Sequence, residues 1–387
     1  MFSSRLPAQL AANALTDAVE RARAAGLAFR DLTETNPTAV GLPYPDLSDV
    51  FVSQAIASYR PSALGDRTTR EAVVETYRER GIAVSAEHCV LTASTSEAYS
   101  FLFKLLGEPG DEVVVPQPSY PLFDLLTRLD ALVPVPYRLD PAGAWCLDRA
   151  SVERALSPRT RAVLVVSPNN PTGSMLHSDD RDWLVGLASR HRLAIVADEV
   201  FADYPLAPRR DATTMAGESR ALTFTLGGLS KSAGLPQMKL AWIAVSGPDE
   251  DVAGALARLE IIADTYLSVS TPVQVAAHAL LTAGRKIRAS IADRLVRNLS
   301  ALRDLVRARP ALTLVEPEGG WSAVVRVPAI LSEEALVLRL FAEQHVLVHP
   351  GYFFDFADEA YVVLSLLPAP AVFDDGIARL TNGLAGL

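Results

Sequence analysis

The chain has 387 residues, a net charge of −9 from 36 basic and 45 acidic side chains, 49% hydrophobic residues and a mean hydropathy of +0.19. This length is too great for a single hydrophobic core and is sufficient for two domains of ordinary size. The acidic balance, without any basic block, argues against nucleic acid or an anionic membrane surface as the main partner.

Cysteine content and the N-terminal segment bear on the compartment. Cys89 and Cys146 are too few for a disulfide framework, which favours a reducing cytoplasm. Residues 1–20 include charged side chains and no sustained apolar run, so they do not resemble a signal peptide or an anchor. No apolar run approaches the roughly 20 residues of a membrane span. We therefore predict a cytoplasmic protein without a membrane partner.

The first part of the chain is predicted to contain two helices and a long loop. An alanine-rich amphipathic pattern predicts a helix over Pro7–Gly26. The proline-punctuated stretch 31–45, which holds Asn36 and Gly41, predicts a loop that can border a site. A second helix is expected over Asp66–Gly81.

Strand and helix signals alternate in the middle of the chain. The predicted strands are Cys89–Leu91, Glu112–Pro116, Leu132–Pro136, Arg161–Ser167, Leu193–Ala197, Ala221–Leu226 and Leu240–Val245. The predicted helices between them are Ala98–Leu106, Tyr120–Asp130, Ser151–Leu156 and Asp179–His191. Continuous apolar runs fit strands that are covered on both faces, and the alternation predicts a largely parallel sheet with crossover helices.

After Pro248 the alternation of strand and helix signals ends. It begins with helical sequence from Glu250 to about Arg307, interrupted near residues 268–272. Short strand and helix signals follow, at Thr313–Val315, Trp321–Val327, Ser332–Gln344, Val346–His349 and Tyr361–Leu366. This α+β pattern predicts a second, smaller domain. We expect a large domain over 46–282 and a small domain made of 1–45 and 283–387.

Three polar segments directly follow predicted buried strands. They are Ser167–Gly173, the pair Asp198–Glu199, and the glycine-containing loop around Lys231. Ligands of open α/β sheets bind at the carboxyl ends of the strands. A lysine in a desolvated, glycine-lined pocket has a lowered amine pKa and can form a Schiff base. A surface lysine in a turn is the alternative, and the shared position of the three segments favours the reactive lysine.

Ser94, Thr95 and Ser96 open a predicted helix after an apolar strand. Small hydroxyl residues at this position are favourable N-caps. A helix N-terminus also binds phosphate, because its free N–H groups and dipole favour an anion. The two interpretations do not exclude each other.

Taken together, these segments resemble the class I/II aminotransferases, the fold-type I pyridoxal-phosphate enzymes. The resemblance covers nearly the whole chain, and its most specific pieces are Asn170–Gly173, Asp198–Glu199 and Ser230–Lys231 through Lys239, in that order. It implies an α/β fold with a mostly parallel seven-stranded sheet in the large domain and a smaller α+β domain. It also implies pyridoxal 5′-phosphate as cofactor, an amino acid and a keto acid as substrates, and a homodimer with shared active sites.

The resemblance also assigns roles to single residues. Lys231 would form the Schiff base and, once released by substrate, move the proton between Cα and C4′. Asp198 would pair with the pyridinium nitrogen, which makes the ring a better electron sink, and Asn170 would bond the ring O3′. Tyr120 would stack on the ring face. The phosphate ligands would be Ser94, Thr95, Ser96, Ser230, Lys239 and, from the neighbouring subunit, Tyr59, for which an ordinary core or surface aromatic is the alternative.

Two departures from the family pattern concern the cofactor. Lys239 stands where an arginine is usual, which keeps the charge and loses the planar fork. Phe201 stands where a tyrosine usually bonds O3′, and losing that donor should raise the pKa of the cofactor imine. Tyr204 is a candidate replacement if its loop bends suitably.

The third departure concerns the substrate. Val363, in Tyr361–Ser365, occupies the place of the arginine that clamps the substrate α-carboxylate in the family. An apolar side chain cannot supply that contact. Either another group such as Arg326 replaces it, or the substrate is not held as an ordinary α-amino acid.

Substrate contacts and metal sites have weaker signals. We expect Asn36, Gly41, His349 and Tyr352 to contact substrate, with core packing as the alternative for the last two. The six histidines show no pair at metal-ligand spacing, so we predict no metal. Neither a Gly-x-Gly-x-x-Gly after an early strand nor a Gly-x-Ser-x-Gly elbow is present, which argues against a dinucleotide dehydrogenase and a serine hydrolase.

We therefore predict an aminotransferase that works in two half-reactions through a Lys231 Schiff base. A lyase, a decarboxylase or another carbanion reaction on the same fold is the first alternative, motivated by Val363 and Phe201. A non-catalytic regulatory domain that binds the cofactor is the second. Retention of Lys231, Asp198 and Asn170 argues against it.

Overall fold

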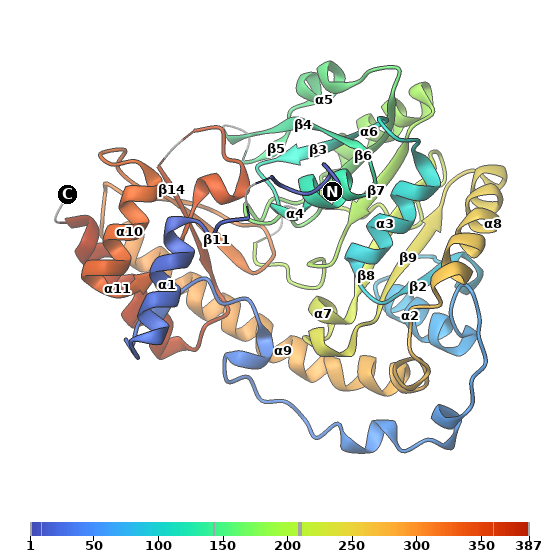
Figure 1. Cartoon of the computed structure of the whole chain (residues 1–387), viewed down its shortest axis with the longest axis horizontal. Helices are drawn as coiled ribbons and strands as arrows, with labels where there is room; N and C mark the ends of the chain where they lie inside the picture. Colours follow the sequence, from blue (N-terminus) through green and yellow to red (C-terminus); the bar gives the residue numbers. More distant parts are fainter. Residues whose placement is uncertain (1, 9, 142–143, 208–210, 359, 386–387) are drawn as a thin grey trace.

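The computed structural model describes residues 2–8, 10–141, 144–207, 211–358 and 360–385. A central sheet of eight strands in the order β2-β9-β8-β7-β6-β3-β4-β5 forms its middle layer (Figure 1). The strands are β2 (Cys89–Thr92), β3 (Glu112–Gln117), β4 (Val133–Asp140), β5 (Cys146–Leu147), β6 (Thr160–Val166), β7 (Ala194–Asp198), β8 (Thr223–Gly228) and β9 (Ala241–Ser246).

The direction of pairing in this sheet is mostly parallel. Strands β4, β3, β6, β7 and β8 run parallel, whereas β9 is antiparallel to both β8 and β2. The seven predicted strands all form, and the two-residue β5 adds an antiparallel edge to β4. The predicted mostly parallel α/β sheet is therefore confirmed.

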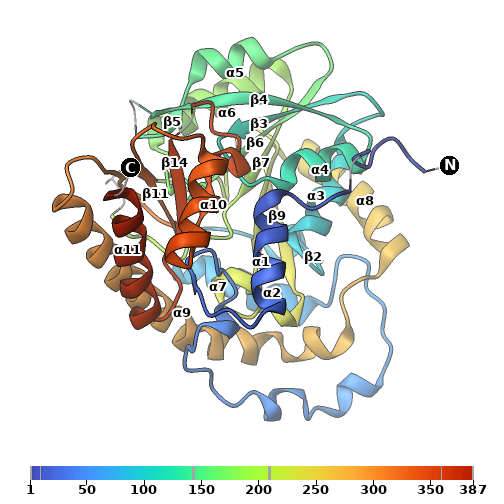
Figure 2. The same cartoon turned by 60° about the vertical axis from the view of Figure 1, so that its left-hand side comes forward.

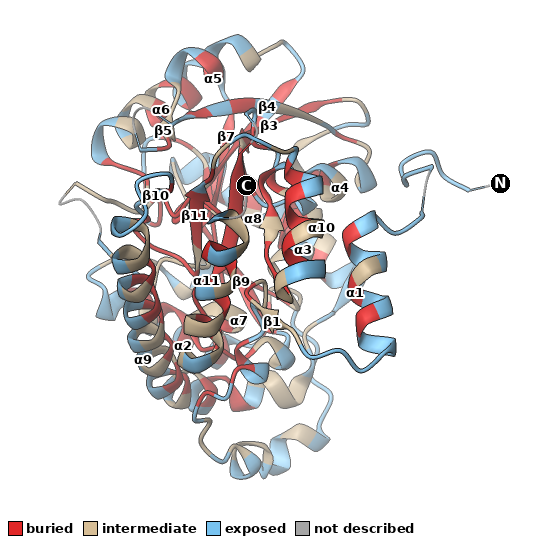
Figure 3. Cartoon of the chain, turned by 90° about the vertical axis from the view of Figure 1, so that its left-hand side faces the viewer, coloured by how far each residue is buried: buried red, intermediate tan, exposed pale blue. Residues whose placement is uncertain are grey.

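Helices cover both faces of the central sheet because successive strand side chains point to opposite faces. In β3, Val113 and Val115 pack with α3 (Thr95–Leu106) and α8 (Asp249–Tyr266). Val114 packs on the other side with α5 (Arg149–Ala155) and α6 (Ser178–His191). Figure 3 shows the buried residues concentrated in the strands and on the inner helix faces.

A second, antiparallel sheet lies in the C-terminal part. Its order is β10 (Thr313–Val315), β11 (Ser322–Arg326), β14 (Tyr361–Ser365) and β13 (His349–Pro350). Helices α1 (Ala14–Ala24), α10 (Glu333–Gln344) and α11 (Pro370–Ala385) pack beside it (Figure 2). Helix α11 was not predicted from the sequence. This arrangement is the smaller α+β unit that the sequence predicted.

Two features bear on the division of the chain into domains. Strand β1 (Arg30–Asp31) pairs with β12 (Val346–Leu347), which joins the N-terminal segment to the C-terminal part. The 37-residue helix α9 (Thr271–Arg307) runs without interruption through residue 283, where the sequence placed a domain boundary. The domain limits remain a prediction, and α9 would be shared by both domains.

Helix α1 is shorter than predicted. It begins at Ala14 because Asn13 caps it, accepting a hydrogen bond at 2.8 Å from the Thr16 N–H. Residues 7–8 and 10–13 are not helical, and residue 9 of the predicted helix lies outside the described residues. Within the described ranges, no helix combines the length and the apolar character needed to cross a membrane.

Candidate active site

The polar segments singled out from the sequence meet at one edge of the central sheet. The ladder sets Val166 of β6 beside Asp198 of β7, and Asp198 beside Leu226 of β8. Strand β9 then places Ala241 beside both Gly228 and Thr92. The segments that follow β2, β6, β7 and β8 therefore begin at the same edge, as the sequence predicted.

Lys231 lies in α7 (Leu229–Ser232), directly after β8. Its Nζ is 4.6 Å from the ring centroid of Trp321 and 5.3 Å from that of Phe201. Burial lowers the pKa of its amine to about 8, and the nearby Asp198 carboxylate opposes part of that change. The amine is therefore available as a nucleophile near neutral pH, as predicted for a reactive lysine.

Asp198 ends β7 and is 7% exposed. It accepts hydrogen bonds from the Tyr99 hydroxyl at 2.8 Å and from the Val200 N–H at 3.2 Å. Burial raises the pKa of its carboxyl, and these bonds and the Lys231 charge lower it. The carboxylate is held by two donors and senses the charge of the Lys231 amine, so it can stabilise a cationic group in a dry site.

Tyr99 was missed by the sequence analysis. It lies on the inner face of α3, and its sequence position beside Ala98 and Leu102 indicates only a buried aromatic side chain. A buried tyrosine usually places its hydroxyl against a polar partner, and here that partner is Asp198. A tyrosine on an otherwise apolar helix face was the only available signal.

Glu199, the next residue in the chain, holds a neighbouring loop in place. It is buried and accepts hydrogen bonds from the Thr214 hydroxyl at 2.6 Å and the Met215 N–H at 2.7 Å. These bonds hold the segment around residues 214–215 against the end of β7. Of the Asp198–Glu199 pair, the aspartate is therefore the group that belongs to the site.

The start of α3 lies at the same edge. Ser94 is the N-cap, and its hydroxyl accepts a hydrogen bond from the Glu97 N–H at 3.1 Å, which confirms the predicted cap. Thr95 and Ser96 form the first turn, whose N–H groups have no carbonyl partner within the helix. A phosphate at this terminus stays a prediction that the geometry allows.

Two further predicted phosphate ligands lie beside it. Ser230 precedes Lys231 in α7, and Lys239 stands two residues before β9 in a left-handed conformation, with φ of 53°. Lys239 is exposed. Because Gly228 and Thr92 share the partner Ala241, this loop and the start of α3 flank the same point of the sheet.

The loop after β6 carries Asn170, whose Oδ1 accepts a hydrogen bond from the Ser322 hydroxyl at 3.3 Å. The loop is fixed by its buried neighbour Asn169, which accepts from the Ser119 hydroxyl at 3.0 Å and donates to the Pro118 carbonyl at 3.1 Å. Asn169 was not predicted. By holding Ser119, it positions the adjacent Tyr120.

Tyr120 is 40% exposed and packs edge-on against Phe123, with ring centroids 5.8 Å apart. Burial raises the pKa of its hydroxyl, and the Asp198 carboxylate raises it further. Tyr120 therefore lies near Asp198. A ring that stacks on a ligand held by Asp198 has to lie in this neighbourhood.

Trp321 is a second residue that the sequence analysis did not place in the site. Its ring meets Phe201 and Tyr204 edge-on, with centroids 5.5 and 5.2 Å apart. Its buried Nε1 has no hydrogen-bond partner among the described residues. A buried donor without a partner is costly, and a bound ligand can supply the acceptor.

Tyr204 does not replace the tyrosine that the family carries at position 201. Its hydroxyl donates to the main-chain carbonyl of Lys231 at 2.5 Å, so its role is to hold the lysine loop. Phe201 nonetheless occupies the place expected of that tyrosine, beside the lysine amine. Compared with the family pattern, position 201 has an aromatic ring but no hydroxyl donor.

The predicted carboxylate-binding place is apolar. Val363 of β14 is 3% exposed and lies between Val324 of β11 and His349 of β13 in the ladder. Arg326 is exposed and stands four residues along β11 from Ser322, which is about 13 Å. A role of Arg326 in binding the carboxylate stays a prediction.

His349 is the polar side chain beside Val363. Residues directly opposite each other in a sheet point to the same face, so the imidazole lies on the Val363 face. Burial lowers the pKa of His349, and the Asp31 carboxylate opposes this. A neutral imidazole can still donate one hydrogen bond.

The other predicted contacts lie farther out. Tyr59 is 76% exposed and Tyr352 is 41% exposed. Asn36 accepts hydrogen bonds from the Thr38 N–H and hydroxyl, and Gly41 is exposed with φ of 67°. The loop that carries Asn36 and Gly41 reaches the lysine loop, because the hydroxyl of Tyr44 in the same loop donates to the Gly234 carbonyl at 2.6 Å.

These groups fit the polar features of pyridoxal 5′-phosphate. Lys231 offers an amine to its aldehyde, and Asp198 offers a buried carboxylate to its ring nitrogen, where a cation would compensate the burial. Asn170 stands at the same sheet edge, and the start of α3 offers N–H donors to the phosphate.

A mostly parallel sheet with a half-buried lysine and a buried aspartate at its carboxyl edge defines the class of pyridoxal-phosphate-dependent transferases of fold type I. The chain belongs to the aminotransferase class I and II family, whose model matches residues 36–366. It is a pyridoxal-phosphate-dependent aminotransferase.

Curated relatives and solved structures agree with this assignment. The glutamate-pyruvate aminotransferase AlaA of Haemophilus influenzae is 27% identical over 361 residues, which cover 90% of this chain and 89% of AlaA. The alanine aminotransferase of Mycobacterium tuberculosis is 28% identical over 94% of this chain and 87% of its own length. An Escherichia coli aminotransferase structure superposes with a TM-score of 0.86 at 25% identity, covering 100% of this chain and 98% of the other.

Proposed function

We propose that this aminotransferase moves the amino group of a small α-amino acid, of the alanine and glutamate type, to a keto acid. Relatives named as alanine and glutamate-pyruvate aminotransferases support this substrate class, since they align over about nine-tenths of the chain. The observation that carries the reaction is the buried Lys231 amine beside Asp198 at the carboxyl edge of the sheet.

The cofactor would be held by residues of one sheet edge. Lys231 would hold the aldehyde carbon and Asp198 the ring nitrogen, while Asn170 would face O3′ and Tyr120 the ring face. The phosphate would be bound by Ser94, Thr95, Ser96, Ser230 and Lys239. When bound, pyridoxal phosphate supplies an electron sink for the substrate carbanion.

The chain's own residues then control one proton. The Lys231 amine, with a pKa of about 8 before the cofactor binds, would take the proton from the substrate Cα and deliver it to the cofactor's C4′, two bonds away. The Tyr99 hydroxyl keeps the Asp198 carboxylate ionised and oriented. The aromatic wall of Phe201 and Trp321 excludes water from the amine.

The α-carboxylate would be recognised without the usual arginine. His349 lies on the Val363 face, and the buried Nε1 of Trp321 lacks a partner among the described residues. These two N–H donors would bond the carboxylate, with Asn36, Gly41 and Tyr352 lining the approach. Such contacts are neutral, so we expect weaker discrimination for the carboxylate than a bidentate arginine gives.

A homodimer would complete the site, with Tyr59 reaching the phosphate of the neighbouring subunit. Tyr59 is highly exposed, and so are Val52, Ile261 and Tyr266, at 73%, 70% and 51%. The partner subunit would cover these apolar side chains. Because Lys231 and Tyr59 would serve one site from two chains, a hybrid of a Lys231→Ala chain and a Tyr59→Phe chain should contain one intact site. Activity that does not return on mixing would contradict the shared site.

The proposed location is the cytoplasm, which suits the two thiols Cys89 and Cys146. Cell fractionation that places the activity in another compartment would refute it.

The reaction is tested with purified holoenzyme and matched donors. We expect alanine or glutamate to convert the cofactor to its amine form, and the matching keto acid to restore it. Amines of the same size without an α-carboxylate should react at least tenfold more slowly, if two hydrogen bonds to the carboxylate are lost. Equal rates for both kinds of donor would refute the proposed substrate class.

A further inference from the structure

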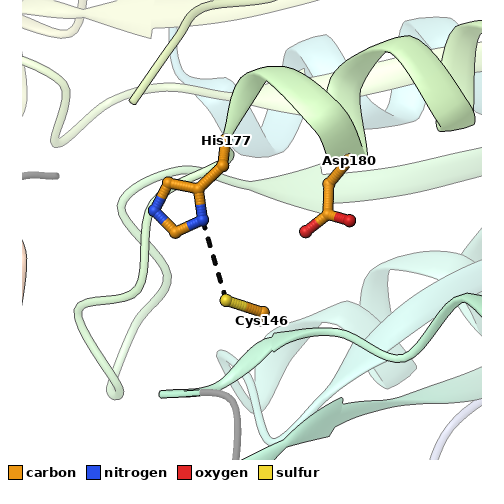
Figure 4. A group of neighbouring side chains, drawn as sticks. All are labelled: Cys146, His177 and Asp180. Carbon is orange, nitrogen blue, oxygen red and sulfur yellow. Dashed lines mark hydrogen bonds between the residues drawn. The ribbon is translucent and has the colours of Figure 1, made fainter. Parts of the chain in front are cut away.

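Three potential metal ligands meet at a place separate from the lysine site (Figure 4). Cys146 comes from the edge strand β5, and His177 and Asp180 come from the start of α6. The Cys146 Sγ, a His177 ring nitrogen and an Asp180 carboxylate oxygen all lie within 4.8 Å of one another. We propose that this cluster is a binding site for a zinc ion.

The spacing of the sulfur and nitrogen ligand atoms suits zinc. Sγ of Cys146 is 3.7 Å from Nδ1 of His177. Sulfur and nitrogen ligands at their usual distances in a tetrahedral zinc site lie about 3.6 Å apart. His177 and Asp180 are three residues apart at the start of a helix, which places both side chains on one side, and Figure 4 shows them there. Cysteine, histidine and aspartate are each ordinary zinc ligands.

A buried carboxylate orients the histidine. Nε2 of His177 lies 3.0 and 3.1 Å from the two carboxylate oxygens of Glu318. When Nε2 donates its proton to Glu318, the lone pair on Nδ1 faces Cys146. Metal-bound histidines commonly have this carboxylate partner on the nitrogen that does not bind the metal. Glu318 is itself fixed, since it accepts a hydrogen bond from the Met175 N–H at 2.9 Å.

The cluster is open to an incoming ion. Cys146 and Asp180 are partly exposed and line a cavity that also reaches Ser174 and Asn169. Arg149 contacts one carboxylate oxygen of Asp180, Oδ1, at 2.8 Å, which leaves the second oxygen for a metal. Three protein ligands and a water molecule would complete a tetrahedron.

The site is connected to the cofactor edge through Glu318. The Glu318 N–H donates to the Gly173 carbonyl at 3.1 Å, and Gly173 belongs to the loop of Asn170. Three residues after Glu318, Trp321 contacts Lys231. A zinc ion on His177 would therefore fix the segment that joins the Asn170 loop to the aromatic wall. The proposal does not depend on the identity of the amino donor.

The test is zinc binding by the holoenzyme, measured by equilibrium dialysis after chelator treatment. We expect one zinc per chain in the wild type and in Cys89→Ser, which removes the other, buried cysteine as a matched control. Cys146→Ser and Asp180→Asn should each weaken binding at least tenfold. Glu318→Gln should weaken it about tenfold to a hundredfold, because it acts through His177.

Cobalt provides a second readout that is independent of activity. Co²⁺ in a tetrahedral site with a sulfur ligand has visible d–d bands to the red of the cofactor absorption, and these bands should disappear in Cys146→Ser. No bound zinc in the wild type would overturn the proposal. Zinc binding and cobalt bands that are unchanged in Cys146→Ser would also overturn it.

Discussion

The cofactor edge and the substrate edge of the proposed active site differ in how many of the family's usual side chains they retain. At the cofactor edge, Lys231 and Asp198 stand at the ends of neighbouring parallel strands, and Tyr99 fixes the carboxylate. At the substrate edge, on β13 and β14, a valine and a histidine stand where a carboxylate clamp is expected. We propose that the first region supports the reaction and that the second determines which substrate binds.

With these proposed roles, reaction type and substrate choice are carried by separate units of the fold. The cofactor edge belongs to the large sheet, whose ladder fixes its residues relative to one another. The substrate edge belongs to the small antiparallel sheet, where a single side chain such as Val363 can change without disturbing the lysine. Four predictions test this separation.

The largest effect is expected at Lys231. Lys231→Ala removes the amine that holds the cofactor and moves the proton, so kcat should fall by about 10⁴-fold or more. Steady-state kinetics measures it, and borohydride trapping should no longer link cofactor to the chain. The exposed Lys286→Ala is the matched control. Residual activity within tenfold of wild type would mean that another group does the chemistry.

A smaller effect is expected at Tyr99. Tyr99→Phe removes a hydrogen bond to a charged carboxylate, worth about 1.5–3 kcal/mol, and should lower kcat roughly tenfold or more. That bond lowers the pKa of Asp198, so its loss raises the pKa and moves the acid limb of the kcat profile to higher pH. Tyr137→Phe, which loses a buried bond to the Leu164 carbonyl, controls for stability. An unshifted profile would remove Tyr99 from the mechanism.

At the substrate edge, His349→Phe should raise KM for α-amino acids about tenfold and leave kcat nearly unchanged, because one hydrogen bond to the carboxylate is lost. Donors without an α-carboxylate should be unaffected. His278→Phe, at an exposed position on α9, is the control. An equal effect on both donor types would show that His349 only supports packing.

The smallest effect is a titration. In cofactor-free protein, Lys231 should be modified by amine reagents half-maximally near pH 8, because burial disfavours its ammonium form. Mass spectrometry of the digested protein should locate this modification at Lys231. Between about pH 8 and 10.5, the unfolded chain holds a proton on Lys231 that the folded chain has already released. The free energy of unfolding of the cofactor-free protein should therefore rise with pH over this range. An ordinary pKa for Lys231 would contradict its burial.

Much of the fold was predictable from the sequence, because continuous apolar runs and alternating helices identify a parallel sheet. The lysine, aspartate and asparagine segments were found for the same reason, since each directly follows a strand. The predicted start of α1 was wrong, since Asn13 caps the helix later than the alanine pattern suggests.

Residues that act across the fold could not be found in this way. Tyr99 and Trp321 meet the site from α3 and from the segment before β11. The polar tip of Tyr99 on an apolar helix face hints at a polar partner, but the local sequence does not say which one. Tyr204 bonds the lysine main chain rather than facing a ligand, which depends on a loop geometry invisible to spacing. The Cys146–His177–Asp180 cluster combines residues from separate elements, so spacing between histidines did not reveal it.

The most direct test of the account is the absorption spectrum of the holoenzyme during one half-reaction. Adding alanine or glutamate should convert the cofactor band to that of its amine form, and the matching keto acid should restore it. A band that no α-amino acid changes would contradict the account. Consumption of the amino acid without any need for a keto acid would equally contradict it, and would show that the cofactor edge supports a different reaction.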